Sequence, residues 1–206
     1  MADFAEALKR PFSDIKKLLI YIALSIIPIV NFISMGYLLD VAETSMKKKK
    51  DLPEWKDFAR FFVEGLKGLI IGVVYMIPVF IIGFILLGAY RGIFAQMDVG
   101  LIVQNFAALG TGFIVTMLLT ILIAYFSLGA IMRYIKFRKI EEAFKFKEIS
   151  KKVFTKTYFV AWFIGLIIFA LISALFSLIP VIGSIIGSAI GGIFYFSVLG
   201  EAYAKA

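Results

Sequence analysis

The chain has 206 residues, of which 62% are hydrophobic, and its mean hydropathy is +0.97. Soluble domains are about 45–50% apolar, so this chain has too little polar surface to cover a water-exposed globule. It contains no cysteine and no histidine, which excludes disulfides, thiolate nucleophiles and typical zinc and haem sites. The 22 basic and 14 acidic residues give a charge of +8, which in a membrane protein favours basic cytoplasmic loops over nucleic-acid binding.

The apolar segments predict membrane helices. They are continuous runs of roughly 20 or more residues, not the alternating stretches of about ten that form outer-membrane barrels. The N-terminus, MADFAEALKRPF, has charges throughout and therefore does not resemble a cleaved signal peptide. We expect an all-α integral membrane protein that forms a single membrane domain over 1–206. It would be a bundle of about six membrane helices, with five as the alternative, and three amphipathic interfacial lead-in helices.

Each lead-in helix would rest in the headgroup region before the chain enters the membrane. The first covers 1–17 and has an apolar stripe that begins at Phe4. The second would start with Asp51 as N-cap and Glu54 at the capping-box position. The third follows Arg133 and is the most basic.

Proline residues decide how the apolar runs are divided. At about 1.5 Å per residue, a single helix over 158–199 would be about 63 Å long, twice the hydrocarbon core, so Pro180 to Gly183 must form a tight turn. Pro28 and Asn31 lie in the middle of the run 18–42 and fit either a turn or a kink.

An Ile-Pro-Ile/Val tripeptide recurs at Pro28, Pro78 and Pro180. If Pro28 is a turn and Pro78 a kink, both termini and every basic residue except Arg91 are cytoplasmic, as the positive-inside rule favours. We therefore prefer the turn at Pro28. A kink there, with five crossings, would move the basic residues of the first lead-in outside.

A second pattern, Phe-x-acid-x-x-Lys, occurs where each lead-in enters the membrane, starting at Phe12, Phe62 and Phe146. Together the two patterns suggest three repeated units. These are 1–50, a lead-in plus a hairpin; 51–138, a lead-in plus two long spans; and 139–206, a lead-in plus a helical hairpin.

Two sets of residues suggest packing and lipid contact. Gly183, Gly187 and Gly191 recur every four residues, which allows close helix approach within the bundle or, as the alternative, in a dimer. Basic and aromatic residues near the membrane ends are candidates for contact with anionic lipid headgroups: Lys47, Lys48, Lys49, Lys50, Trp55, Lys151 and Lys152. Membrane lipids are the expected partners, with a homo-oligomer or a membrane protein as a further possibility.

Several of these segments together resemble a known family. They are ALKRPF at 7–12, the cluster Pro28, Asn31 and Gly36-Tyr37, the LPEW segment at 52–55, Phe62 to Gly65, and Tyr75 to Pro78. In these segments the chain is similar to the prokaryotic, largely archaeal membrane family of domain of unknown function 4013. The resemblance covers the first half of the chain well and the second half loosely. The resemblance implies a multi-span membrane protein and no catalytic residue. Gly36 and Tyr37 would serve close helix packing and an interfacial contact.

The residues offer little for catalysis. Asp40, Glu43 and Glu201 lie at membrane ends and could hold Mg²⁺, although interfacial ion pairs explain them more simply. The phosphate-binding glycine loop and the paired-aspartate signatures of membrane enzymes are absent from the sequence. We therefore expect no cofactor, no metal and no enzyme activity. The function that we expect first is that of a scaffold or a lipid-interacting, membrane-organising protein. The alternative is a small-solute transporter or channel subunit that acts as an oligomer.

Overall fold

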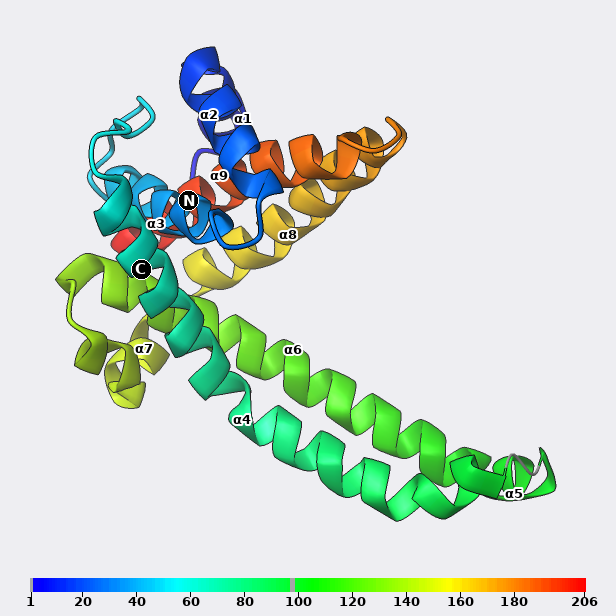
Figure 1. Ribbon diagram of the computed structural model, residues 1–206. Helices are drawn as coiled ribbons and strands as arrows, with labels where there is room; N and C mark the ends of the chain where they lie inside the picture. The colour runs from blue at the N-terminus through cyan, green and yellow to red at the C-terminus, as the bar shows by residue number, and fades with distance from the viewer. Residues whose placement is uncertain (1, 97–98) are drawn as a thin grey trace. The chain divides into compact units, whose positions relative to one another are not determined.

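The computed structural model describes residues 2–96 and 99–206, and every regular element in this part is a helix, as expected (Figure 1). Four of the described helices are long and apolar enough to cross a membrane, which indicates a membrane-embedded protein. They are α4 (Phe58–Gln96), α6 (Phe106–Phe137), α8 (Lys156–Ser177) and α9 (Gly183–Lys205).

The expected count of about six membrane helices is not confirmed, because the first apolar run is divided between two short helices. α2 (Ile15–Ile26) has 12 residues and α3 (Asn31–Met46) has 16. At about 1.5 Å per residue they are about 18 and 24 Å long, shorter than a hydrocarbon core of about 30 Å. α3 also carries two carboxylates, Asp40 and Glu43, in its C-terminal half.

The chain turns at Pro28 and does not continue there as a kinked helix. Proline disfavours helical angles at the residue before it. Ile27 accordingly has extended angles, φ −93° and ψ 117°, and ends α2. α3 begins at Asn31, whose N–H donates to the Ile27 carbonyl at 2.8 Å.

The other two copies of the Ile-Pro tripeptide have different structures. Pro180 lies in the turn between α8 and α9, where Val181 has a φ of 68°. Pro78 lies inside the continuous helix α4. The three copies of the tripeptide therefore form two turns and one internal helical position.

The chain forms two compact units, whose boundaries differ from those of the three expected repeats. Unit 1 contains the residues up to Ile71 together with Gly129–Ala206, and unit 2 is Gly72–Leu128. α4 and α6 each run from one unit into the other.

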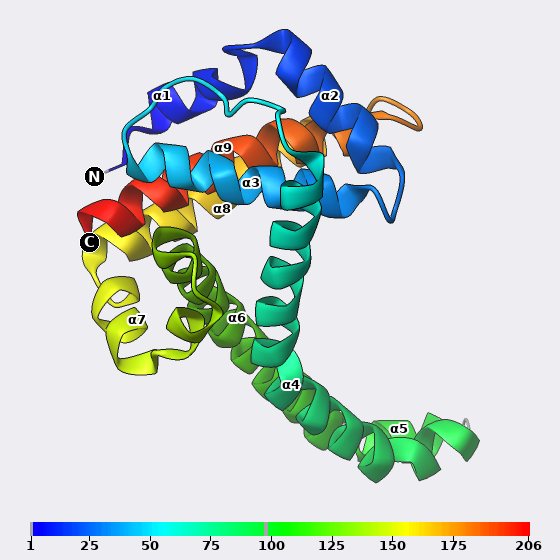
Figure 2. The same ribbon diagram turned by 60° about the vertical axis from the view of Figure 1, so that its left-hand side comes forward.

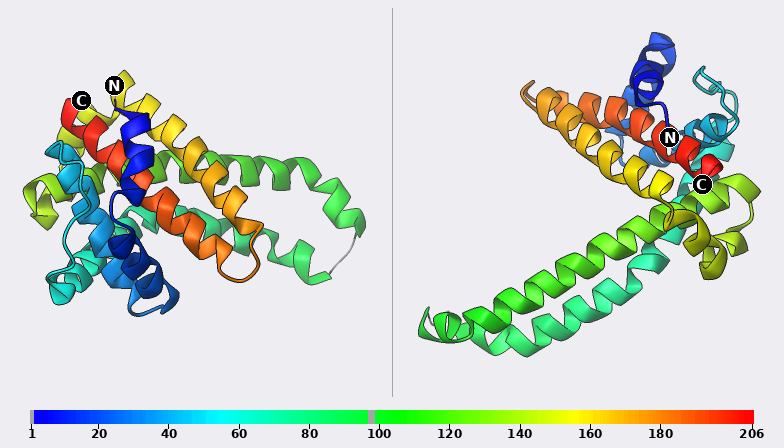
Figure 3. Two further views of the ribbon diagram at one scale, coloured as in Figure 1. Left: turned by 90° about the horizontal axis from the view of Figure 1, so that it is seen from above. Right: turned by 180° about the vertical axis from the view of Figure 1, so that it is seen from behind.

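In unit 1, α9 is the central helix and α3 and α8 pack along it (Figures 1 and 2). The glycines of α9 allow this approach. A Cβ on Gly200 would lie 2.4 Å from the Ala42 carbonyl oxygen of α3, and one on Gly183 would lie 1.9 Å from the Phe176 oxygen of α8. Gly187 and Gly191 also face α8, so the four-residue glycine spacing packs the α8–α9 hairpin (Figure 3).

The segment before α4 departs from the expected helix. Asp51 does not cap a helix, because α4 begins only at Phe58, with the N–H of Arg60 donating to the Asp57 carboxylate at 2.9 Å. The preceding segment packs against α3 instead. The Trp55 ring stacks on that of Tyr37 with centroids 3.9 Å apart, and the Tyr37 hydroxyl donates to the Pro53 carbonyl at 3.0 Å.

Continuous amphipathic helices at the first and third lead-ins are not confirmed either. The first contains α1 (Phe4–Lys9) and a short 3₁₀ turn, η1 (Arg10–Phe12), and both pack on α9. The third contains the 3₁₀ helix η2 (Ile140–Phe144) and the eight-residue α7 (Phe146–Val153). The apolar face of α7 is partly covered by α6, since a Cβ on Gly129 would meet the Val153 side chain.

Unit 2 is a pair of helical segments from α4 and α6, joined through α5 (Val99–Gln104). The Tyr90 hydroxyl donates to the Ala108 carbonyl at 3.0 Å, and the rings of Tyr75 and Phe126 lie 5.9 Å apart. Many of its described large apolar side chains are exposed; Phe84, for example, is 73% exposed. Such a surface is stable in lipid and would aggregate in water.

The α3–α4 contact in unit 1 depends on two facing glycines. A Cβ on Gly36 would lie 1.8 Å from the Phe61 carbonyl oxygen, and one on Gly65 would lie 2.0 Å from the Phe32 oxygen. Because these neighbours are backbone atoms, they cannot move aside without separating the helices.

We predict that Gly36→Ala lowers the free energy of unfolding in detergent micelles by about 1–3 kcal/mol, the usual range for overpacking. Gly72→Ala is the matched control, because a Cβ there meets nothing within 4 Å. That variant should be neutral or slightly stabilising, since alanine favours helix. Equal effects of the two substitutions would contradict the close α3–α4 contact.

Candidate functional site

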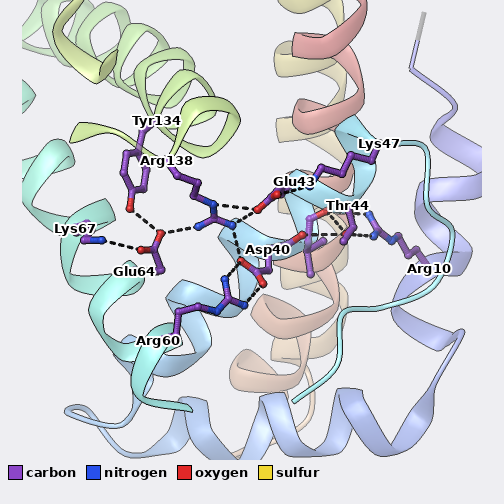
Figure 4. Close-up of polar contacts among 11 residues, drawn as sticks. Arg10, Asp40, Glu43, Thr44, Lys47, Arg60, Glu64, Lys67, Tyr134 and Arg138 are labelled. Carbon is purple, nitrogen blue, oxygen red and sulfur yellow. Dashed lines mark hydrogen bonds and ion pairs between the residues drawn. The ribbon is translucent and has the colours of Figure 1, made fainter. Parts of the chain in front are cut away.

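The charged residues of unit 1 lie at one end of its helices. Residues 18–39 and 157–200 contain no charged side chain. The charges gather where α3 ends, α4 begins, α6 ends and α9 ends, and many of them bond to one another (Figure 4). This end contains two polar centres on opposite faces of α3.

The first centre is organised by Arg138, the residue that follows α6. Its guanidinium bonds to carboxylates from two other helices (Figure 4). It donates to Glu64 Oε2 at 2.5 Å, to Asp40 Oδ1 at 2.6 Å and, through Nε, to Glu43 Oε2 at 3.0 Å. Burial alone would lower the pKa of Arg138, but the hydrogen bonds and charges of Glu43 and Asp40 outweigh it and raise the pKa above its ordinary value.

The backbone at Arg138 is strained. Its φ is 55°, in the left-handed region that costs a non-glycine residue about 1–2 kcal/mol. The strain places a cation between three acidic side chains, and the contacts with those side chains offset it.

Each carboxylate of this centre has a further donor. Asp40 pairs with Arg60, Glu43 with Lys47, and Glu64 with Lys67 at 2.8 Å. Glu64 Oε2 also accepts from the Tyr134 hydroxyl at 2.6 Å. We call this set the Arg138 cluster: Asp40, Glu43, Lys47, Arg60, Glu64, Lys67, Tyr134 and Arg138.

The Arg138 cluster is poorly suited to a metal ion. A divalent cation needs several carboxylate oxygens with free lone pairs, and these oxygens already accept from cations. Glu201, the third residue of the Mg²⁺ hypothesis, lies on α9 and accepts from the Asp3 N–H at 2.9 Å and pairs with Lys205. Within the described part of the chain, acidic residues form no group of three that could hold a metal.

The second centre surrounds Arg10, which is 5% exposed. Its guanidinium donates to oxygens of α3 and α9 and to the loop that follows α3. The acceptors are the carbonyls of Val41 at 3.1 Å and Asp51 at 3.1 Å and the hydroxyls of Ser45, Thr44 at 2.5 Å and Ser197 at 3.0 Å. Burial lowers the pKa of Arg10 to about 10. Among the described residues no carboxylate forms an ion pair with this guanidinium.

Sequence reasoning identified Asp40 and Glu43 but missed their partner. Arg138 and Arg10 were counted only as basic charges of the lead-ins. At Glu64 the sequence did indicate an ion pair, because the Phe-x-acid-x-x-Lys pattern places an acid and a lysine three residues apart. In the structure these pairs are all close, at 3.6 Å for Asp14–Lys17 and 2.8 Å for both Glu64–Lys67 and Glu148–Lys151.

The residues proposed for lipid contact occupy different environments. Lys47 to Lys50 are exposed in and after the turn that ends α3. Trp55 is half buried by its stacking on Tyr37, and its Nε1–H donates to the Lys17 carbonyl at 3.1 Å. On α7, Lys151 is exposed and pairs with Glu148, whereas Lys152 is half buried.

The residues proposed for turns and packing also divide into two groups. Pro28, Pro78 and Pro180 are exposed. Gly36, Tyr37 and the three glycines at the start of α9 are buried, and Asn31 is half buried at the first position of α3.

We predict that Arg138→Gln lowers the free energy of unfolding by about 2–4 kcal/mol, because three carboxylates lose a shared cation at a partly buried site. Lys139→Gln removes the same charge one residue later, at an exposed position. It should change stability by less than about 0.5 kcal/mol. If the two variants unfold alike in detergent micelles, the Arg138 cluster does not hold this end of the protein together.

Comparison with known proteins gives one match. No curated protein and no solved structure is significantly similar to the chain. The family described as "Protein of unknown function (DUF4013)" matches residues 19–199, which include the four acidic and basic residues at the centre of the Arg138 cluster, Asp40, Glu43, Glu64 and Arg138. Because this match covers most of the chain, the protein belongs to the DUF4013 family.

Proposed function

We propose that the protein is a non-catalytic, multi-pass membrane protein that organises lipid around it through a basic surface at one end. The observation that carries this proposal is the contrast between the two sets of charges at that end. The acids of the Arg138 cluster are neutralised within it, whereas Lys48 and Lys49 in the adjoining turn are exposed and form no ion pair with a described residue. Exposed lysines beside a membrane attract anionic headgroups by about 1 kcal/mol each.

The distribution of apolar surface supports a role in lipid contact. α8 has large exposed apolar side chains such as Leu171 and Leu175, and those of unit 2 are exposed along both of its helical segments. α9, by contrast, is mostly buried within unit 1. α8 and the helical segments of unit 2 therefore each offer apolar surface to acyl chains.

The proposed topology has four crossings, by α4, α6, α8 and α9. The α2–α3 hairpin enters the membrane without crossing it, because its arms are short and its tip, at Ile27 and Ile29, is exposed and apolar. Both termini and the charged end lie on the cytoplasmic side, as the positive-inside rule favours.

The test is the lipid preference of the reconstituted protein. We expect spin-labelled phosphatidylglycerol to associate several-fold more strongly than phosphatidylcholine, with a preference that weakens as salt rises. Replacing Lys47, Lys48, Lys49 and Lys50 together by glutamine should remove most of this preference.

The matched control replaces four scattered lysines by glutamine at positions that are also exposed: Lys16, Lys56, Lys139 and Lys147. The net charge change is the same, so the preference should be largely kept if the location of the charge matters. Equal losses in both variants would contradict a specific basic surface. Selective solute flux through vesicles that contain the protein would instead favour a transporter.

A further inference from the structure

We propose that a pocket beside Arg10 binds a phosphate group. This inference deepens the proposed function and rests on it, because it names the headgroup chemistry that the basic end would recognise. The pocket has a volume of about 290 Å³ and is lined by α1, the end of α3 with its following turn, and the end of α9. All of these elements belong to unit 1.

The charges around the pocket leave a positive excess. Five basic and three acidic side chains line it. Each acid already has a partner, since Glu6 pairs with Lys50 at 3.3 Å, Glu201 pairs with Lys205 at 2.5 Å, and Asp3 caps α1 by accepting from the Glu6 N–H at 3.0 Å.

Three cations of the pocket have no such partner. Lys48 and Lys49 form no ion pair with any described residue, and neither does Arg10. Arg10 is the most buried of the three, at 5% exposed, and bonds only to neutral oxygens. Its Nε–H is buried and has no acceptor among the described atoms. Because its terminal N–H groups already donate to neutral oxygens and its Nε–H is buried, Arg10 would attract an anion in the pocket through its charge.

The turn that carries Lys48 gives an independent observation. The Lys49 N–H donates to the Thr44 carbonyl and the Lys48 N–H to the Ser45 carbonyl, both at 2.9 Å. This is the Schellman arrangement at a helix C-terminus, in which glycine normally occupies the left-handed position. Here Lys48 occupies it, with a φ of 57°. The strained conformation places a lysine at the pocket where glycine would fit the backbone better.

This geometry gives a test that does not depend on damaging the fold. The full-length protein is unfolded thermally in uncharged detergent micelles, in inorganic phosphate and in chloride of the same ionic strength. Phosphate should raise the unfolding midpoint. Lys48→Gly should raise the midpoint without phosphate, because it relieves the left-handed strain, yet weaken the apparent phosphate affinity about tenfold or more.

Lys49→Gln should weaken the affinity in the same way, whereas Lys56→Gln, an exposed lysine outside the pocket, should leave it unchanged. A second arm uses nanodiscs of phosphatidylcholine with or without phosphatidic acid. If only phosphatidic acid shifts the unfolding midpoint, and the shift depends on Lys48, the ligand is a lipid headgroup phosphate. If only inorganic phosphate shifts the midpoint, the ligand is a soluble phosphate.

The proposal is overturned if neither probe shifts the midpoint, or if Lys48→Gly and Lys49→Gln leave the shift intact. That result would leave the proposed function standing if the Lys47–Lys50 variant still loses its phosphatidylglycerol preference. If the lysine variants lose neither the phosphate-dependent shift nor the phosphatidylglycerol preference, the result contradicts both the phosphate pocket and the proposed function.

Discussion

Arg138 supplies the interaction that ties the ends of α3 and α6 to the start of α4 in unit 1. A charge removed from water is costly unless it is hydrogen-bonded, and an opposite charge beside it lowers that cost further. The acids Asp40, Glu43 and Glu64 come from α3 and α4, and Arg138 at the end of α6 bonds to all three. One guanidinium thus joins residues that are 74 to 98 positions apart in sequence.

α3 connects the two polar centres because its opposite faces carry different groups. Asp40 and Glu43 face Arg138, while Val41 and Ser45 offer oxygens to Arg10. Its N-terminal half carries no charge and meets α4 through the facing glycines Gly36 and Gly65. A single short helix therefore holds a charged end and an uncharged end.

Sequence patterns predicted the helical membrane class, the family and the turn at Pro180, because apolar run length and proline act locally. The turn at Pro28 was favoured from charge distribution, although the count of crossings built on it was not confirmed. The tripeptide alone could not decide the matter, since its copies at Pro28 and Pro78 are almost identical and have different structures.

The contacts of the site could not be predicted in the same way. Arg10 and Arg138 each stand in a basic stretch, and nothing local distinguishes a buried arginine from the lysines beside it. The helix expected from Asp51 failed because a tertiary contact outweighed a capping motif. Trp55 stacks on Tyr37 and draws the segment into extended contact with α3, so the helix starts later, at Phe58.

In the proposed topology the charged end of unit 1 lies on the cytoplasmic side, the α8–α9 turn reaches the other side, and the α2–α3 turn stays in the membrane. The chain has no cysteine, so a single introduced cysteine is the only thiol that the reagent can label. The most direct measurement is labelling of Lys56→Cys, Ile29→Cys and Val181→Cys with an impermeant thiol reagent in intact and opened cells. We expect labelling of Val181→Cys in intact cells, of Lys56→Cys only in opened cells, and of Ile29→Cys in neither. Labelling of Lys56→Cys in intact cells would contradict the orientation, and labelling of Ile29→Cys there would show that α2 and α3 cross the membrane.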